Sequence, residues 1–98
     1  MQMNMFNPAH PGTVLREAYV LPLKLTITEL ARRLDISRKT ASELVNARGN
    51  VTVEMALRLG KATGSTAQSW LNMQVQWDLW RAKKERLEKS LHVEPLAA

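Results

Sequence analysis

The chain has 98 residues, a net charge of +5 and a calculated isoelectric point near 10.1. This length allows a single domain with a small core, and the positive charge favours a polyanionic partner. There are no cysteines, which excludes disulfides and thiolate metal sites and suits a reducing cytoplasm. No apolar run approaches the length of a membrane span, the N-terminus lacks a signal-peptide pattern, and β-branched residues never alternate over a useful length. We therefore expect an all-α, cytoplasmic protein without a membrane contact.

The N-terminal part of the chain predicts an arm, one helix and a connector. Residues 1–10 are polar and interrupted by a proline, so we expect an extended arm. Pro11-Gly12 suits the entry to a helix over residues 13–20, in which apolar side chains follow helical spacing. A further proline ends this helix, and residues 21–25 should form the connector.

Residues 26–46 predict two short helices joined by a tight corner. Thr26 and Glu29 have the S/T-x-x-E spacing of a capping box, which satisfies free backbone N–H groups at a helix start. Asp35 stands where many such corners have Gly, and we expect it to take the left-handed conformation that Asp tolerates better than most residues. Ser37 is then a good N-cap for the second helix.

The outer face of the second helix, residues 37–46, is hydrogen-bonding and mostly cationic. It consists of Arg38, Lys39, Thr40, Ser42, Glu43 and Asn46. Such a helix fits the major groove of DNA, where Arg or Lys donates to guanine and Glu accepts from cytosine. An ordinary helical hairpin is the alternative, because charged outward faces are common. The capping pattern, the short joint and the basic tip favour a helix-turn-helix motif over 26–46, with 37–46 as the reading helix.

Two more helices are expected after this motif. A turn at Gly49 ends the reading helix, and Thr52 caps a helix that runs toward Gly64, a plausible C-terminal stop. Ser65 and Gln68 have capping-box spacing and are expected to open the last and longest helix.

The last helix carries two apolar stripes on nearly opposite sides. One consists of Trp70, Met73, Trp77 and Trp80, and the other of Leu71, Val75, Leu79 and Ala82. A small core can cover only one of them, so we expect a second interface, a dimer contact or a groove for a partner, with Trp77 and Trp80 nearest to it. The alternative is that Trp70 belongs to the core and the other two indoles cap its edge. We expect one domain over 11–90 and a frayed tail over 91–98.

Nothing in the sequence indicates catalysis. His10 and His92 lie near opposite ends of the chain, without a carboxylate or hydroxyl at a telling spacing. There is neither a glycine-rich phosphate loop nor a paired metal-ligand motif. We therefore expect no enzyme activity, no cofactor and no metal.

Several motifs together resemble the HigA/VapI-type antitoxins, within the Cro/C1-type (XRE) helix-turn-helix superfamily. The corner at 26–46 resembles the superfamily as a whole, whereas NPAHPG at 7–12, VLRE at 14–17 and VEMALRL at 53–59 resemble the antitoxins. The last helix is similar to the family's WLN-Q-x-x-x-DLW signature, matched at Trp70, Leu71, Asn72, Gln74, Asp78, Leu79 and Trp80.

The resemblance implies a five-helix, lambda-repressor-like domain that dimerises on a palindromic operator in its own promoter, and so associates with the nucleoid. It also implies binding to a HigB-like toxin, a small ribonuclease that cuts mRNA. By this resemblance the base contacts fall on Arg38, Lys39, Thr40 and Glu43. The contacts to the DNA backbone fall on Ser37, Ser42, Asn46 and Arg48. The chain departs from the family's Asn-Gly ending of the reading helix with the sequence Asn46-Ala47-Arg48-Gly49.

Three functions are therefore to be compared. The first is an antitoxin that also represses its own operon, the second is a stand-alone phage-type or metabolic repressor without a toxin, and the third is a protein-binding module whose basic helix never meets DNA. A toxin-sized open reading frame beside the gene separates the first two. A gel shift on the gene's own upstream region separates the third.

Overall fold

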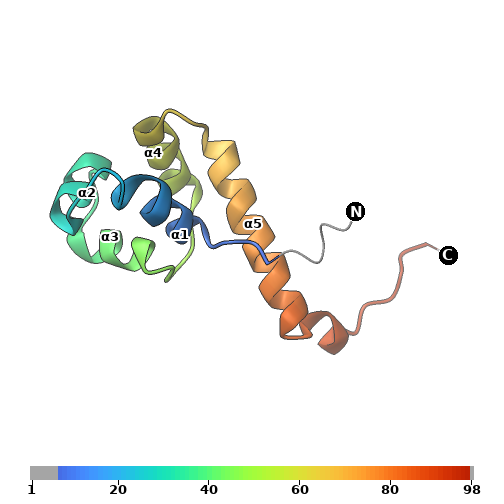
Figure 1. Cartoon of the computed structure of the whole chain (residues 1–98). Helices are drawn as coiled ribbons and strands as arrows, with labels where there is room; N and C mark the ends of the chain where they lie inside the picture. Colours follow the sequence, from blue (N-terminus) through green and yellow to red (C-terminus); the bar gives the residue numbers. More distant parts are fainter. Residues whose placement is uncertain (1–6, 98) are drawn as a thin grey trace.

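The computed structural model describes residues 7–97 of the chain; most of the expected arm over 1–10 and the final residue lie outside this range. In chain order the elements are α1 (Pro11–Leu15), the π-helical turn η2 (Arg16–Val20), α2 (Ile27–Leu34), α3 (Arg38–Val45), α4 (Val53–Thr63), α5 (Ala67–Lys84) and the 3-10 turn η3 (Leu87–Ser90). No strand occurs between residues 7 and 97. The all-α class and the five-helix arrangement are thus confirmed (Figure 1).

Side-chain caps start α2, α3 and α4 where the sequence places them, whereas α1 begins at Pro11, two residues before the expected start. Thr26, Ser37 and Thr52 each accept a hydrogen bond from the backbone N–H three residues later, at 3.0, 3.0 and 3.2 Å. The capping box at the start of α2 is only half formed, because the Glu29 carboxylate turns to Arg32 and Arg33 instead of returning to the cap. Each cap satisfies a backbone donor that the helix itself leaves free.

The expected capping box of Ser65 and Gln68 is wrong, because α5 begins one residue later. Gly64 has a φ of 72°, and the N–H of Ser65 donates to the Gly60 carbonyl (3.0 Å), so Ser65 still belongs to the closing turn of α4. Thr66 caps α5 and accepts from the amide of Ser69 (3.1 Å). The Ser65 hydroxyl instead accepts a hydrogen bond from the Trp70 indole (2.9 Å).

The core lies where α1 to α4 meet the first turns of α5. Its buried apolar side chains are Leu15, Val20, Leu30, Ala31, Leu34, Ala41, Leu44, Val45, Val51, Ala56, Leu59 and Trp70. Helix α1 approaches α3 so closely that a Cβ on Gly12 would lie 1.8 Å from the Leu44 carbonyl oxygen. Close contact of this kind fixes α3 against the rest of the domain.

Helix α5 joins the core only through its first turns. Trp70 and Gln74 are buried, and from Val75 onward the side chains facing away from the core are exposed. Figure 1 shows the C-terminal half of α5 extending away from α1–α4, with the chain entering α1 beside it. The longest dimension is accordingly 53 Å against 26 and 22 Å for the other two. Residues 91–97 follow in no helix and are exposed.

Candidate nucleic-acid interface

The corner between α2 and α3 depends on one left-handed residue. Asp35 has φ 57° and ψ 50°, as the sequence predicts for this position. Beyond it the N–H of Ile36 donates to the Ala31 carbonyl (3.0 Å), which closes the end of α2 before α3 starts. The two helices of the motif are therefore joined by a defined turn rather than by a loose loop.

The exposed face of α3 carries the residues expected to contact DNA bases. At about 100° per residue, Lys39 and Glu43 lie near the middle of this face, with Arg38 and Thr40 at its two edges. Arg38, Lys39 and Glu43 are exposed, whereas Thr40 is half-buried and accepts a hydrogen bond from the Ser37 hydroxyl (2.9 Å). Between residues 7 and 97, no ion pair engages any of these charged groups. Their charges are thus free to meet an external partner.

Three of the four residues expected at the DNA backbone lie at the ends of the same helix, and the fourth, Ser42, lies half-buried within it. Ser37 is the N-cap, and its hydroxyl also accepts from the Thr40 amide. Asn46 closes the C-terminus of α3 by donating from Nδ2 to the Ser42 carbonyl (2.8 Å). Arg48 lies just beyond and is exposed. Both ends of α3 therefore present polar groups beside the basic face.

The segment after α3 departs from helical geometry twice. Ala47 has a φ of 58° and Gly49 a φ of 81°. The N–H of Arg48 still donates to the Glu43 carbonyl (2.8 Å), but from Gly49 onward the bonds run to distant side chains. The Gly49 carbonyl accepts from His10 Nε2 (3.0 Å), and the Val51 N–H donates to Gln74 Oε1 (2.7 Å).

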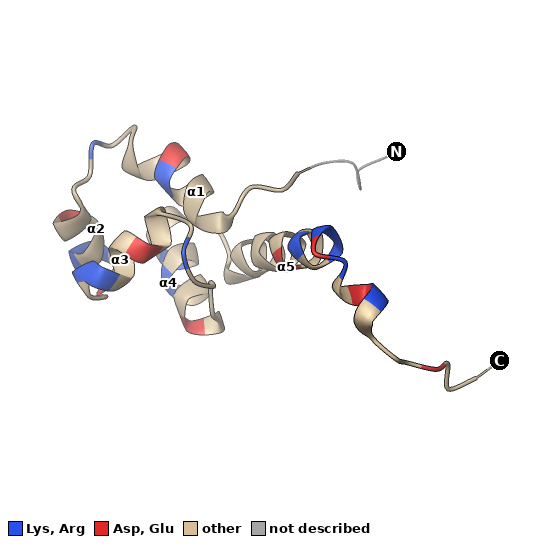
Figure 2. Cartoon of the chain, turned by 90° about the horizontal axis from the view of Figure 1, so that it is seen from below, with Lys and Arg blue, Asp and Glu red and all other residues tan. Residues whose placement is uncertain are grey.

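Basic residues gather on α2 beside the reading helix. Arg32 and Arg33 both bond the Glu29 carboxylate, and their guanidinium groups, that of Arg32 first, hold the pKa of Glu29 below its ordinary value. Both arginines remain largely exposed, as expected for a solvated helix face. Figure 2 shows this basic end of the domain and a second group of Lys and Arg at the C-terminal end of α5.

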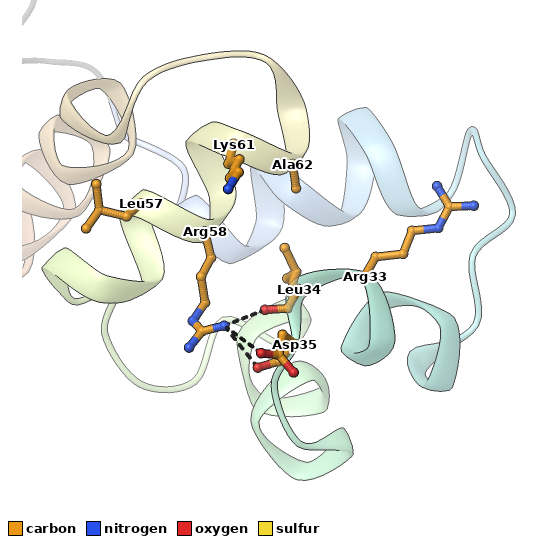
Figure 3. Close-up of a pocket in the computed structure, with 7 residues that line it drawn as sticks. All are labelled: Arg33, Leu34, Asp35, Leu57, Arg58, Lys61 and Ala62. Atoms are coloured by element: carbon orange, nitrogen blue, oxygen red, sulfur yellow. Dashed lines mark hydrogen bonds and ion pairs between the residues drawn. The ribbon is translucent and has the colours of Figure 1, made fainter.

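Arg58 ties α4 to the end of α2. Its Nη1 donates to the Leu34 and Asp35 carbonyls (2.9 and 3.0 Å), which α2 leaves without helical partners. Its Nη2 donates to Glu54 (2.7 Å), and this bond raises the pKa of the guanidinium. Figure 3 shows Arg58 within an open groove of about 490 Å³, lined by Arg33, Leu34, Asp35, Leu57, Arg58, Lys61 and Ala62. Because these bonds within the domain use the Nη1 and Nη2 donors of Arg58, its side chain stabilises the corner between α2 and α3.

Trp77 and Trp80, the residues expected nearest a second interface, are half-buried by the chain itself. The Trp77 ring meets His10 edge-on, with ring centroids 5.3 Å apart, and Trp80 Nε1 donates to Asn7 Oδ1 (3.0 Å). On the other side of α5, Val75 and Leu79 are 53% and 62% exposed. The N-terminal arm thus covers Trp77 and Trp80, and the opposite stripe stays open at Val75 and Leu79, whereas its Leu71 packs against the core.

Sequence reasoning missed two of the polar side chains that shape this region. His10 is 4% exposed and Gln74 is 5% exposed, and both bond the segment that follows α3. Gln74 lies in the WLN-Q signature, which flagged the position but not its role. Its partners in that segment, Asn50 and Val51, are more than twenty residues away, so no local spacing reveals them.

Two other kinds of site are not found among residues 7–97. Between residues 7 and 97, no group of three or more His, Asp and Glu side chains is placed to hold a metal ion. None of the helices there is long and apolar enough to cross a membrane.

Comparisons with known proteins agree with this geometry. The helix-turn-helix family model HTH_3 matches residues 15–70. An uncharacterized helix-turn-helix-type transcriptional regulator of Haemophilus influenzae is 41% identical over 86% of this chain and 79% of its own length. Antitoxin HigA-1 of Vibrio cholerae is 32% identical over 98% of this chain and 90% of its own. The structure of Pseudomonas aeruginosa antitoxin HigA with the higBA promoter superposes with a TM-score of 0.80, at 32% identity over 91% of this chain and 98% of that one.

Proposed function

This chain belongs to the helix-turn-helix family of DNA-binding transcriptional regulators whose members include the HigA antitoxins, and we propose that it is the antitoxin of a toxin–antitoxin pair that represses its own operon as a dimer. Its relatives are regulators and antitoxins rather than enzymes. The observation that carries the proposal is the capped, exposed face of α3, in a chain that aligns over nearly all its length with an antitoxin solved on its promoter. The proposed role places the protein on the nucleoid in the cytoplasm.

In the proposed complex, α3 enters the major groove of a palindromic operator. Arg38 and Lys39 would donate to guanine, Glu43 would accept from cytosine N4, and Thr40 would contact a base at the edge of the face. Ser37, Ser42, Asn46 and Arg48 would bind phosphates at the ends of α3 and set its register. The exposure of the charged side chains and the absence of internal ion pairs among them, within residues 7–97, support this division.

A dimer is required because one reading helix contacts too few bases for useful selectivity, and two copies read half-sites about one helical turn apart. We place its contact on the open stripe of α5, centred on Val75 and Leu79, since these apolar side chains have no cover in the single chain. Trp77 and Trp80, the candidates from the sequence, lie on the other side of α5, which the arm already covers.

Matched charge substitutions on α5 test the dimer contact. Leu79→Glu should yield monomers by light scattering, because it sets a carboxylate into an apolar contact. Trp80→Glu should weaken the dimer less, and Gln76→Glu, at an exposed position on the same helix, should leave its mass unchanged. If Leu79→Glu leaves the mass of the dimer unchanged, the open stripe is not the dimer contact. If only Trp80→Glu yields monomers, the dimer contact lies at the tryptophans.

The toxin partner rests on the alignment with HigA-1 rather than on a surface of this chain. Co-expression of this chain with the neighbouring small open reading frame, followed by purification through a tag on this chain, tests it. We expect a stoichiometric partner whose toxicity this chain relieves. If the neighbour proves harmless and the chain elutes alone, the function is that of a stand-alone repressor.

A gel shift on the region directly upstream of the gene tests the DNA function separately. We expect a complex that resists competition by random DNA and weakens steeply with salt, because phosphate contacts release counterions. Equal affinity for both DNAs would contradict sequence-specific repression.

A further inference from the structure

We propose that Gln74 and His10 are positioning residues for DNA binding. They hold the segment after the reading helix, residues 47–51, in the one conformation that places Arg48 against a phosphate. The inference rests on the proposed function and deepens it, because neither side chain lies on the DNA-facing surface itself.

Gln74 fixes the far end of this segment from α5. The Val51 N–H donates to its Oε1 at 2.7 Å, and its Nε2 donates to Asn50 Oδ1 (3.2 Å) and to Asp78 Oδ1 (3.0 Å). The side chain is 5% exposed and its bond to the Val51 N–H is buried, so water does not compete freely for that bond. Three bonds from one amide determine its orientation, and through it the path of the backbone at Asn50 and Val51.

His10 fixes the middle of the same segment from the N-terminal side. Its Nδ1 accepts from the Gly12 N–H (2.9 Å), which leaves the Nε2–H as the donor to the Gly49 carbonyl (3.0 Å). The edge-on contact with Trp77 on α5 sets the plane of the imidazole. The histidine thereby serves both as the N-cap of α1 and as a tie to the segment.

The start of the segment is closed against α3, because the Ala47 and Arg48 N–H groups donate to the Leu44 and Glu43 carbonyls (3.1 and 2.8 Å), whereas the bonds at Gly49 to Val51 run to His10 and Gln74. Gly49 has a φ of 81° and nothing lies within 4 Å of a Cβ built there, so no packing holds it. Arg48 and Asn50 are exposed and contribute no packing. Beyond Arg48, the buried Val51 side chain and the bonds from Gln74 and His10 set the path of the backbone, and with the bond from the Arg48 N–H to Glu43 they set where Arg48 points.

A measurable consequence follows for the salt dependence of binding. The slope of log K against log salt counts the phosphates that a protein contacts, whereas partial unfolding lowers the active fraction without changing this count. Releasing the segment should therefore lower the slope by about 1 per protomer, as expected for one lost phosphate contact. A purely structural role for Gln74 or His10 would not move it.

The test compares two variants with matched controls on the full chain. Gln74→Met removes the amide at similar length, and Gln76→Met makes the same change at an exposed site on α5. His10→Phe keeps an aromatic ring against Trp77 but removes both hydrogen bonds, and His92→Phe is its exposed control. Each is titrated, at several salt concentrations, on the upstream duplex that the wild-type chain binds, and the folded fraction is measured by chemical denaturation.

We expect the slope to fall for Gln74→Met and His10→Phe and to keep its wild-type value in both controls. If Gln74→Met does not fold, His10→Phe decides alone. Folded variants with the wild-type slope overturn the proposal, and so does weaker binding with an unchanged slope, which would indicate lost base contacts. Failure of the wild-type chain to bind DNA would instead contradict the proposed function, so the two failures are distinguishable.

Discussion

The side-chain bonds that start α2 and α3 run to partners close in sequence, whereas the side-chain bonds that join α5 to the rest of the domain run to partners far from it. The caps of α2 and α3 act over three residues, and the Glu29 ion pairs act over three and four. In α5 the bond from Gln74 to Val51 spans 23 positions and that from Trp80 to the arm spans 73. The two regions thus differ in how their geometry is determined.

This difference determines whether a substitution will affect DNA recognition or folding. The outer face of α3 takes no part in the core, so changes there should alter DNA recognition and leave folding alone. Changes in contacts between distant segments should instead disturb the fold or the position of the DNA-facing surface.

Gly12→Ala should have the largest effect, because it breaks a close approach between distant segments. The new Cβ would overlap the Leu44 carbonyl oxygen of α3, which is backbone and cannot rotate away. We expect a loss of about 3 kcal/mol or more in the free energy of unfolding, measured by urea denaturation. Glu17→Ala, on the exposed side of the neighbouring turn, should change it by less than about 0.5 kcal/mol. Similar stability of both variants would show that α1 can shift without cost.

Arg38→Ala should have the opposite profile, with folding intact and recognition impaired. The side chain is exposed and engages no ion pair within residues 7–97, so stability should stay within about 0.5 kcal/mol of the wild type. Binding to the upstream duplex should weaken by about 1–3 kcal/mol, with relaxed specificity at one base step. Lys61→Ala on α4 is the control for removal of a surface charge. Equal losses on operator and random DNA would assign Arg38 to a phosphate.

Thr66→Ala should cost about 1 kcal/mol of stability, the usual effect of removing an N-cap. The same change at Thr28, exposed inside α2, should cost nothing of this size, because that hydroxyl caps no helix. Denaturation midpoints of the two variants make the comparison. No loss at Thr66 would return the cap to Ser65, where the sequence placed it.

Much of the fold is predictable from sequence, because the bonds that start its helices join residues that are close in sequence. Thr26, Ser37 and Thr52 were identifiable because a cap and its target lie three residues apart, and Asp35 because a corner requires a left-handed residue. The start of α5 was misplaced by one position, because the closing turn of α4 claims Ser65. The sequence does not predict that the arm covers one side of α5, because no spacing links Trp80 to a residue 73 positions earlier.

The candidate site likewise has one part that is predictable from local sequence and one part that is not. The exposed face of α3 follows from helical periodicity, so the sequence predicts which residues lie on it. In the structure the residues expected to contact bases are exposed or half-buried on that face. The supports of the segment behind it, His10 and Gln74, do not follow from periodicity, because these polar residues are buried and bonded only through contacts with distant segments.

Ala47→Gly should give the smallest effect, and with the opposite sign. A Cβ at φ 58° costs about 1–2 kcal/mol, whereas Gly loses about 0.5–1 kcal/mol more conformational entropy on folding, so a net gain of about 0.5–1 kcal/mol is expected. Ala62→Gly, exposed within α4, should instead lose about as much, because its backbone is helical and only the entropy term remains. The pair is measured by urea denaturation, and no gain at Ala47 would mean that the left-handed turn carries no strain. If the gain is found and the salt slope of DNA binding stays at the wild-type value, the conformation of the segment is set by its distant ties and not by the identity of residue 47.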